Sequence, residues 1–156
     1  MWCVIASIAW VTFSCEEFCE ESNRTAVVVN FFSSENDALL TANITIKGIE
    51  NDSTLYSKAN LSQVMLPVNP VADVMSFSII PIIRNDTLPA DTLTIRYIRH
   101  NGFISSECGC VTLAEIQDEP ERTKNAITNV VVTNHKVTTV SYRQQVINAE
   151  NIRIYY

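Results

Sequence analysis

The sequence predicts an all-β protein, a single antiparallel β-sandwich domain of immunoglobulin-like or similar type. The strongest observation is in residues 91–99, where Leu93, Ile95 and Tyr97 alternate with polar residues, the period of a strand with one buried face. Roughly eight or nine such short segments follow one another about every 8–15 residues, which is typical of a sandwich or barrel. No segment carries a sustained helical period of apolar residues.

Four strands are expected in the first part of the chain. Residues 25–32 are apolar on both faces, so this strand should lie in the centre of a sheet. Residues 40–47 alternate between apolar and polar side chains, as a half-buried strand does. A turn at 50–53 leads to a short strand at 54–56, and another short strand is expected at 63–66.

Prolines shape the next part of the chain. Residues 67–70 contain two prolines, so they are expected to form a connection or an edge rather than a central strand. Residues 75–79 alternate as a strand, which Pro81 is expected to disrupt or to place at a sheet edge. A loop is expected at 84–89.

The strand at 91–99 is expected to end in a turn at His100-Asn101-Gly102, because Asn-Gly adopts positive φ at little cost. The chain would then return through Phe103, with residues 111–113 as the hairpin partner. Residues 118–124 are charged and contain a proline, which favours a polar loop or a short helix.

Three further strands are expected at the end of the chain, at 127–133, 136–141 and 150–156. In the last of these, Ile152, Ile154 and Tyr156 share one face. A terminal strand paired in a sheet would fix the end of the chain, so truncation there is expected to be harmful.

Length and charge exclude some classes of protein. A chain of 156 residues is about the size of one ordinary domain. The formal net charge is −6, and the basic residues are scattered rather than gathered on one face. Nucleic-acid binding is therefore not expected, because it needs a basic surface that neutralises phosphates.

The beginning of the sequence predicts export. Residues 2–13 are uncharged and mostly apolar, which fits the core of a secretory signal and is too short to span a bilayer. Ser14 and Cys15 follow, and this pattern resembles a bacterial lipobox, in which Cys15 would receive the lipid. The predicted organisation is a lipoprotein signal peptide at 1–14, a tether at 15–24 and a β-sandwich domain at 25–156. The alternative is a buried N-terminal strand or short helix.

Lipidation at Cys15 would place the protein in the cell envelope. The expected location is the outer membrane, on its periplasmic or its surface face, with the membrane as a partner through the N-terminal lipid. Glu16-Glu17 resembles the acidic signal that sends some Bacteroidota lipoproteins to the cell surface. The sequence does not identify a protein or glycan partner.

Three cysteines remain for the domain if Cys3 leaves with the signal and Cys15 takes lipid. An odd number leaves one thiol free. A bond between Cys108 and Cys110 would close a very small, strained ring, so Cys19 is expected to pair with Cys108 or with Cys110. Such a bond closes a loop of ~90 residues and would stabilise the fold by roughly 4 kcal/mol.

The sequence indicates no metal or catalytic site. His100 and His135 could join the cysteines around zinc, but the spacing is not that of a zinc site. The acidic residues within 115–121 match no known calcium loop, and no Gly-x-Ser-x-Gly elbow or Cys-x-x-Cys pair occurs. The sequence therefore predicts no catalytic residue, no metal and no cofactor.

Three functional hypotheses follow. The first is an envelope protein that acts by binding or assembly, without catalysis. The second is a glycan-binding module, suggested by the sandwich and by Tyr142, Tyr155 and Tyr156. The third is a secreted enzyme with an unrecognised site. In addition, Asp86-Thr87-Leu88, in a predicted loop, resembles an O-glycosylation sequence used in Bacteroidota.

Several segments, taken in order, resemble one protein family. They are Cys15-x-x-x-Cys19, Asn30-Phe31-Phe32 and residues 66–70, 91–97, 106–109 and 151–156. Together they span nearly the whole chain and resemble a family of uncharacterised Bacteroidota lipoproteins, a domain of unknown function. The resemblance implies that Cys19 and Cys108 form a structural disulfide. It implies a fold and a compartment, and no activity.

Overall fold

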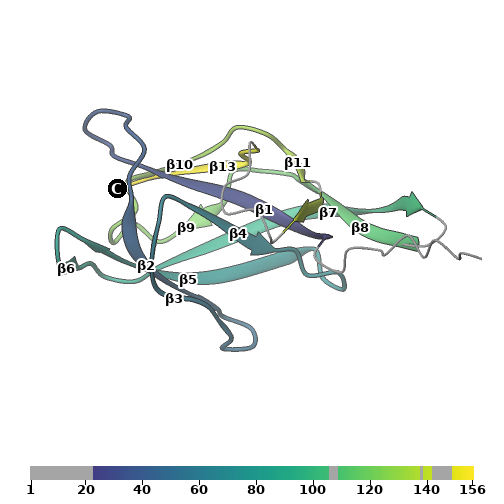
Figure 1. The fold of residues 1–156 in the computed structure, drawn as a ribbon, viewed down its shortest axis with the longest axis horizontal. Helices are drawn as coiled ribbons and strands as arrows, with labels where there is room; N and C mark the ends of the chain where they lie inside the picture. The colour runs from purple at the N-terminus through teal and green to yellow at the C-terminus, as the bar shows by residue number, and fades with distance from the viewer. Residues whose placement is uncertain (1–22, 106–108, 138, 142–148) are drawn as a thin grey trace, which may run out of the picture.

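The computed structural model describes residues 23–105, 109–137, 139–141 and 149–156. Every regular element in these residues is a β-strand, and the strands form two sheets that pack on each other (Figure 1). The predicted all-β sandwich is therefore confirmed. Within the part of the chain that the structure describes, no helix is long and apolar enough to cross a membrane.

The smaller sheet is built on β1 (Asn23–Phe32). This strand pairs with β4 (Gln63–Pro67), β12 (Thr139–Ser141) and β13 (Ile152–Tyr155), and β10 (Asn129–Val132) pairs with β13. β13 runs parallel to β1, whereas the other described pairings are antiparallel. Residues 26–29 are all 1% exposed or less, so the predicted central strand with two apolar faces is confirmed.

The larger sheet has the order β11-β8-β7-β5-β2-β3, with β6 on β5 and β9 on β7. Its strands are β2 (Ala42–Gly48), β3 (Thr54–Leu61), β5 (Val74–Ile83), β6 (Asp86–Thr87), β7 (Asp91–Ser105), β8 (Gly109–Ile116), β9 (Glu121–Arg122) and β11 (Lys136–Val137). The alternation expected in residues 40–47 and 75–79 is confirmed, since alternate residues of β2 and β5 are buried.

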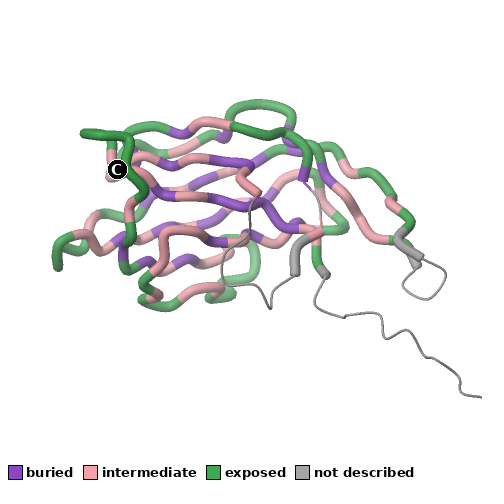
Figure 2. The backbone as a smooth tube through the Cα atoms, turned by 45° about the horizontal axis from the view of Figure 1, so that its top comes forward, coloured by how far each residue is buried: buried purple, intermediate pink, exposed green. Residues whose placement is uncertain are grey.

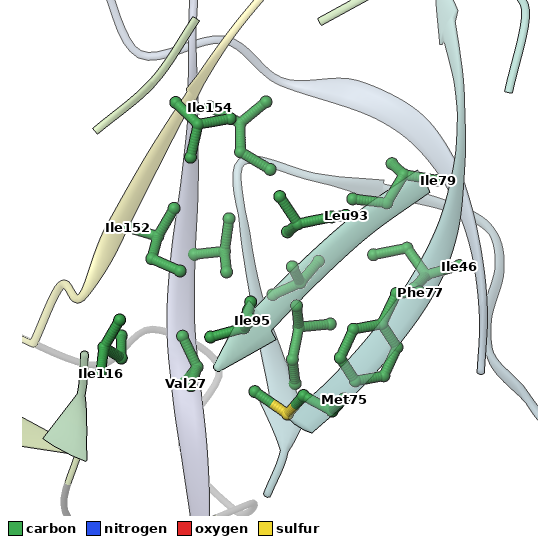
Figure 3. Close-up of a cluster of buried hydrophobic side chains, with 14 of the residues drawn as sticks. Val27, Ile46, Met75, Phe77, Ile79, Leu93, Ile95, Ile116, Ile152 and Ile154 are labelled. Atoms are coloured by element: carbon green, nitrogen blue, oxygen red, sulfur yellow. The ribbon is translucent and has the colours of Figure 1, made fainter. Parts of the chain in front are cut away.

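The core fills the space between the sheets. Val27, Ile152 and Ile154 of the smaller sheet pack with Ile46, Phe77, Ile79, Leu93 and Ile95 of the larger one (Figure 3). Buried positions run along the middles of the strands, and the connecting loops are exposed (Figure 2). Ile152 and Ile154 are fully buried and Tyr156 packs against the same cluster, as predicted for one face of the last strand.

The predicted turn at His100-Asn101-Gly102 is wrong. β7 continues through these residues to Ser105, and they pair in turn with Leu113, Thr112 and Val111 of β8. A Cβ on Gly102 would lie 2.8 Å from Cδ1 of Leu113, so the Leu113 side chain occupies the space that a larger residue at 102 would need. The Asn-Gly signal therefore marked a close approach between strands rather than a reversal.

The effect expected of Pro81 is also wrong. β5 lies between β2 and β7 and continues past Pro81 to Ile83. Pairing with β7 stops at Ile79, and beyond it the Pro81 carbonyl accepts a hydrogen bond from the Leu88 amide at 2.9 Å. In an antiparallel strand the nitrogen and the carbonyl of one residue point to the same side. The nitrogen of Pro81, which has no hydrogen to donate, therefore points away from β2 and past the end of β7, and no hydrogen bond to β2 is lost.

Two further segments differ from expectation. β3 extends to Leu61 rather than ending near residue 56, and its pairing with β2 contains register shifts. Residues 118–124 form no helix; they contain β9, which pairs with Leu93 and Thr94 of β7.

The sandwich has two ends. At the proximal end β1 begins, and the β7–β8 hairpin extends past it (Figure 1). At the distal end β1 finishes at Phe32, followed by the loop that contains Leu39, and β5 turns into β6. The connection between β4 and β5 lies at the proximal end, because Pro67 pairs with Ala26 and the Val68 amide donates to the Thr25 carbonyl.

Candidate functional site

The candidate site is the connection between β4 and β5, residues 67–73, here called the proximal loop. The sequence predicted a connection or an edge at its two prolines, and β4 ends at Pro67. Val71, at the tip, is 81% exposed, the highest value among the exposed large apolar side chains of the described residues. An apolar side chain is thus presented to solvent at the end of the sandwich.

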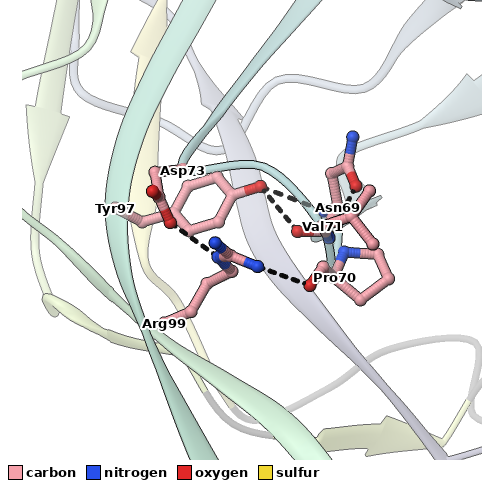
Figure 4. Close-up of polar contacts among 6 residues, drawn as sticks. All are labelled: Asn69, Pro70, Val71, Asp73, Tyr97 and Arg99. Carbon is pink, nitrogen blue, oxygen red and sulfur yellow. Dashed lines mark hydrogen bonds and ion pairs between the residues drawn. The ribbon is translucent and has the colours of Figure 1, made fainter.

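Tyr97 of β7 fixes the middle of the proximal loop (Figure 4). Its hydroxyl accepts a hydrogen bond from the Asn69 amide and donates one to the Asn69 carbonyl, both at 3.1 Å. The ring is 1% exposed, and burial raises the pKa of its hydroxyl above the ordinary value. The phenol therefore stays protonated and satisfies both backbone groups of Asn69.

Arg99, two residues further along β7, holds the second half of the proximal loop. Its Nη1 donates to the Pro70 carbonyl at 2.7 Å and its Nε to Asp73 Oδ1 at 2.6 Å (Figure 4). The hydrogen bond to Asp73 raises the pKa of Arg99. Within the loop, Asn69 Oδ1 accepts from the Val71 amide at 3.0 Å, an Asx turn. The loop is therefore held by side chains from a core strand.

A hollow lies on each side of residues 67–70. The first, of about 270 Å³, has Met75 and Phe77 in its lining, with polar residues that include Glu50 and Asn69. The second, of about 320 Å³, lies between Arg24 and Thr25 of β1 and Val111 and Thr112 of β8. The first is slightly smaller than the usual range of small-molecule sites, which begins at about 300 Å³, and the second is at its lower end.

The first hollow has few titratable groups in its lining. Glu50 is the only carboxylate among its described lining residues, and no histidine or cysteine is among them. General acid–base catalysis usually needs two positioned titratable groups, and this lining supplies one. Apolar and amide groups in a small concave space are the kind of lining that binds a ligand or a partner's side chain.

The predicted lipid and disulfide residues lie outside the described part of the chain. This applies to Cys15, Cys19 and Cys108. Cys110 is described, as a free and exposed cysteine on β8, paired across the hairpin with Phe103.

The two histidines lie in different settings. His100 Nε2 lies 3.7 Å from Glu115 Oε2, and His135 Nδ1 lies 2.6 Å from the Ile116 carbonyl. Among the described residues, no group of three or more histidine, cysteine or acidic side chains could hold a metal ion.

Of the tyrosines proposed for glycan binding, the two that the structure describes are both partly buried. Tyr156 packs against the core, and burial raises the pKa of its hydroxyl. Tyr155 is half-buried beside Phe32, with ring centroids 5.7 Å apart, and the Arg153 guanidinium lies over the Phe32 ring. Tyr142 lies outside the described residues. Tyr155 is the one described tyrosine left to support this hypothesis.

Sequence reasoning missed two polar groups that organise the fold. Asp91 is 1% exposed, and its carboxylate accepts from Thr123 Oγ1 and from the amides of residues 125, 126 and 127, at 2.5–2.9 Å. Burial alone would raise its pKa, but these four hydrogen bonds together lower it. The sequence signal was only an aspartate at the start of a strand, because its partners lie more than thirty residues away.

The second missed group is Asn151, which is 4% exposed. Its Oδ1 accepts from the Val28 amide at 3.0 Å, and its Nδ2 donates to the carbonyls of Asn134 and Lys136 at 3.0 and 2.9 Å. It therefore joins β1 to the turn that precedes β11.

Besides Asp86-Thr87-Leu88, the chain contains two more sequences that begin Asp-Ser or Asp-Thr, at residues 52–54 and 91–93, and the three differ in accessibility. Asp86 and Thr87 form the exposed strand β6, and Asp52 and Ser53 lie in an exposed turn. Asp91 is buried, which removes 91–93 as a modification site.

Comparison with known proteins adds a family and no activity. The family of unknown function DUF6452 matches residues 43–156, more than half of the chain. The matched region contains the proximal loop together with Tyr97, Arg99, Asp91 and Asn151. No curated protein and no solved structure matches the chain. The chain therefore belongs to DUF6452, a family of unknown function.

Proposed function

We propose that this chain is an exported, lipid-anchored protein of the bacterial cell envelope that acts by binding or assembly rather than by catalysis. The observation that carries the anchor is the uncharged apolar run at 2–13 followed by Ser14 and Cys15. Its resemblance to Bacteroidota lipoproteins favours the outer membrane, on the periplasmic or the surface face. Lipoprotein processing adds three acyl chains, and two or more hold a protein firmly on a membrane.

The proximal loop supports binding as the mode of action. Tyr97 and Arg99 fasten this loop to β7 by hydrogen bonds, while Val71 stays exposed. A pre-organised contact surface loses little conformational entropy when it binds, which favours recognition. The hollows beside the loop contain apolar and amide groups and single charges, a lining suited to contact rather than to proton transfer.

Metabolic labelling tests the anchor. Cells that express the full chain are grown with an alkyne fatty acid, and the purified protein is coupled to a fluorophore. We expect label on the wild type and on Cys110→Ala, a control that removes an exposed thiol, and none on Cys15→Ala. Globomycin, which blocks lipoprotein signal peptidase, should cause a larger precursor to accumulate. Full labelling of Cys15→Ala would show that the lipid is attached elsewhere or that the proposal is wrong.

A further inference from the structure

We propose that the proximal end of the sandwich rests on the lipid surface that carries the anchor, with Val71 and Phe103 as the side chains that enter the headgroup region. This inference rests on the proposed lipid anchor. It assigns a contact surface to the folded domain itself, and its ligand is a phospholipid bilayer.

The distribution of exposed apolar side chains is the first argument. Among the described residues, the exposed large apolar side chains are Leu39, Ile49, Val71, Ile98 and Phe103. Val71 at 81% and Phe103 at 71% are the most exposed of the five. Both lie at the proximal end, whereas Leu39, 57% exposed, lies at the distal end.

Hydrogen bonds and strand register place Val71 and Phe103 at the same end. The Thr25 hydroxyl donates to the Thr112 carbonyl, and Thr112 pairs with Asn101, so Asn101 lies level with the start of β1. Phe103 is two residues further out on the hairpin, where it pairs with Cys110. Val71 follows Pro70, whose carbonyl accepts a hydrogen bond from Arg99 in β7, the first strand of that hairpin.

The backbone that carries each of these two side chains is held by hydrogen bonds. The proximal loop is held at Asn69 by Tyr97 and at Pro70 and Asp73 by Arg99 (Figure 4). Phe103 lies in a paired strand opposite Cys110. A fixed apolar side chain reaches into a lipid surface without a further loss of loop entropy.

The position of the proposed lipid is the second argument. β1 begins at Asn23, and Cys15 is eight positions earlier in the sequence. Eight residues reach about 29 Å at most, even when fully extended. The lipid would thus hold the proximal end, rather than the distal end, towards the bilayer. Arg24, exposed beside the second hollow, adds a positive charge that favours anionic headgroups.

The tether also makes weak apolar contacts sufficient. A short covalent link between the lipid and the domain turns the second contact into an intramolecular one, with an effective concentration of about millimolar. Two apolar side chains that would not bind the membrane alone are then expected to be in contact with it for much of the time. The consequence is an orientation: the distal end, with β6 and the loop containing Leu39, faces the aqueous compartment.

Tryptophan fluorescence tests the contact directly. The two tryptophans, Trp2 and Trp10, both precede Cys15, so the processed chain would contain none. Val71→Trp, Phe103→Trp and the distal control Leu39→Trp each introduce one probe at an exposed site. Each lipidated variant is reconstituted into phosphatidylethanolamine–phosphatidylglycerol vesicles, with or without lipids brominated near the headgroup. Thermal unfolding confirms that each variant is folded.

We expect blue-shifted emission and at least twofold bromine quenching for Val71→Trp and Phe103→Trp, and neither change for Leu39→Trp. Co-flotation with the vesicles measures the anchor separately. If the variants co-float with the vesicles but bromine quenches all three probes equally weakly, the proposed membrane contact is wrong and the lipid anchor is still supported. If the protein does not float, the anchor itself is wrong, and the inference falls with it.

Discussion

The Tyr97 hydroxyl makes two hydrogen bonds to one residue, accepting from the Asn69 amide and donating to the Asn69 carbonyl at 3.1 Å each. It joins a core strand of the larger sheet to the connection between β4 and β5. The ring packs in the hydrophobic core while the hydroxyl reaches the loop, so one side chain couples the stability of the core to the shape of the proximal loop.

Tyr97→Phe should therefore destabilise the protein with little change in packing. The ring stays, but the amide and carbonyl of Asn69 lose their partner, at a cost of about 1–3 kcal/mol in the free energy of unfolding. Urea denaturation measures this cost. Tyr155→Phe, which keeps a half-buried ring and removes a hydroxyl elsewhere, is the control. Equal stability of Tyr97→Phe and the wild type would mean that water replaces the hydroxyl.

Alkaline pH should destabilise the fold through the buried tyrosines. Burial raises the pKa values of Tyr97 and Tyr156 above the ordinary value for tyrosine, so the folded state retains protons that the unfolded state loses. Their contribution is complete below about pH 10 and decreases as the pH rises above it. Absorbance at 295 nm, which reports tyrosinate, should show that part of the titration coincides with unfolding. Titration of all the tyrosines at about pH 10, without unfolding, would contradict this prediction.

Asp91→Asn should lower the free energy of unfolding by at least about 2 kcal/mol. The reason is that an amide NH₂ would replace an oxygen that accepts hydrogen bonds from backbone amides. Hydrogen bonds lower the pKa of Asp91, so its stabilisation is present above about pH 4 and is lost as the pH falls through the lower pKa of the folded state. The difference in stability between the wild type and the variant should shrink in that range. Asp86→Asn, at an exposed aspartate, is the control and should change stability by no more than about 0.5 kcal/mol.

Asn151→Asp tests the junction between β1 and the turn before β11. The replacement would point a carboxylate oxygen at the carbonyls of Asn134 and Lys136, where the amide now donates. We expect the free energy of unfolding to fall by more than about 2 kcal/mol at pH 7. Part of this stability should return at acidic pH, once the carboxyl is protonated and can donate a hydrogen bond to a carbonyl. Asn129→Asp, at an exposed position, provides the comparison. A stability of Asn151→Asp that does not depend on pH relative to this control would argue against the assigned contacts.

Arg99→Gln should leave global stability almost unchanged, because Asp73 is largely exposed and Arg99 partly so, and such solvent-accessible pairs contribute little. Local order should change, since the Pro70 carbonyl and Asp73 lose their donor. Amide hydrogen exchange in residues 69–73 is expected to accelerate, while exchange in β1 and β13 stays as in the wild type. Unaltered exchange in the loop would show that Tyr97 alone holds it.

Local pattern was sufficient for most of the strands. Period-two alternation located β2, β5 and β7, and the run of apolar residues from 26 to 29 marked β1 as a strand buried on both faces. Turn chemistry was less informative. Asn101-Gly102 and Pro81 both looked like interruptions, yet each lies inside a strand, because the space and the hydrogen bonds of neighbouring strands decide whether such residues fit.

The candidate site depended on partners distant in sequence. Two prolines predicted the connection at residues 67–70, but nothing local indicated that Tyr97 and Arg99, nearly thirty residues later, would hold it. Asp91 and Asn151 were missed for the same reason, since a buried polar side chain is recognised by partners that only the folded chain brings together.

By itself, the sequence determined the class of fold and the positions of most of the longer strands, because alternation and β-propensity are local properties that each segment carries wherever it lies. It missed the short strands β6 and β9, and it expected one strand at 136–141 where β11 and β12 lie in different sheets. Tertiary structure decided which strands pair, that β13 runs parallel to β1, and that Val71 and Phe103 emerge at the same end of the sandwich. Those outcomes depend on contacts between distant segments, and such contacts exist only once both sheets have closed on their common core.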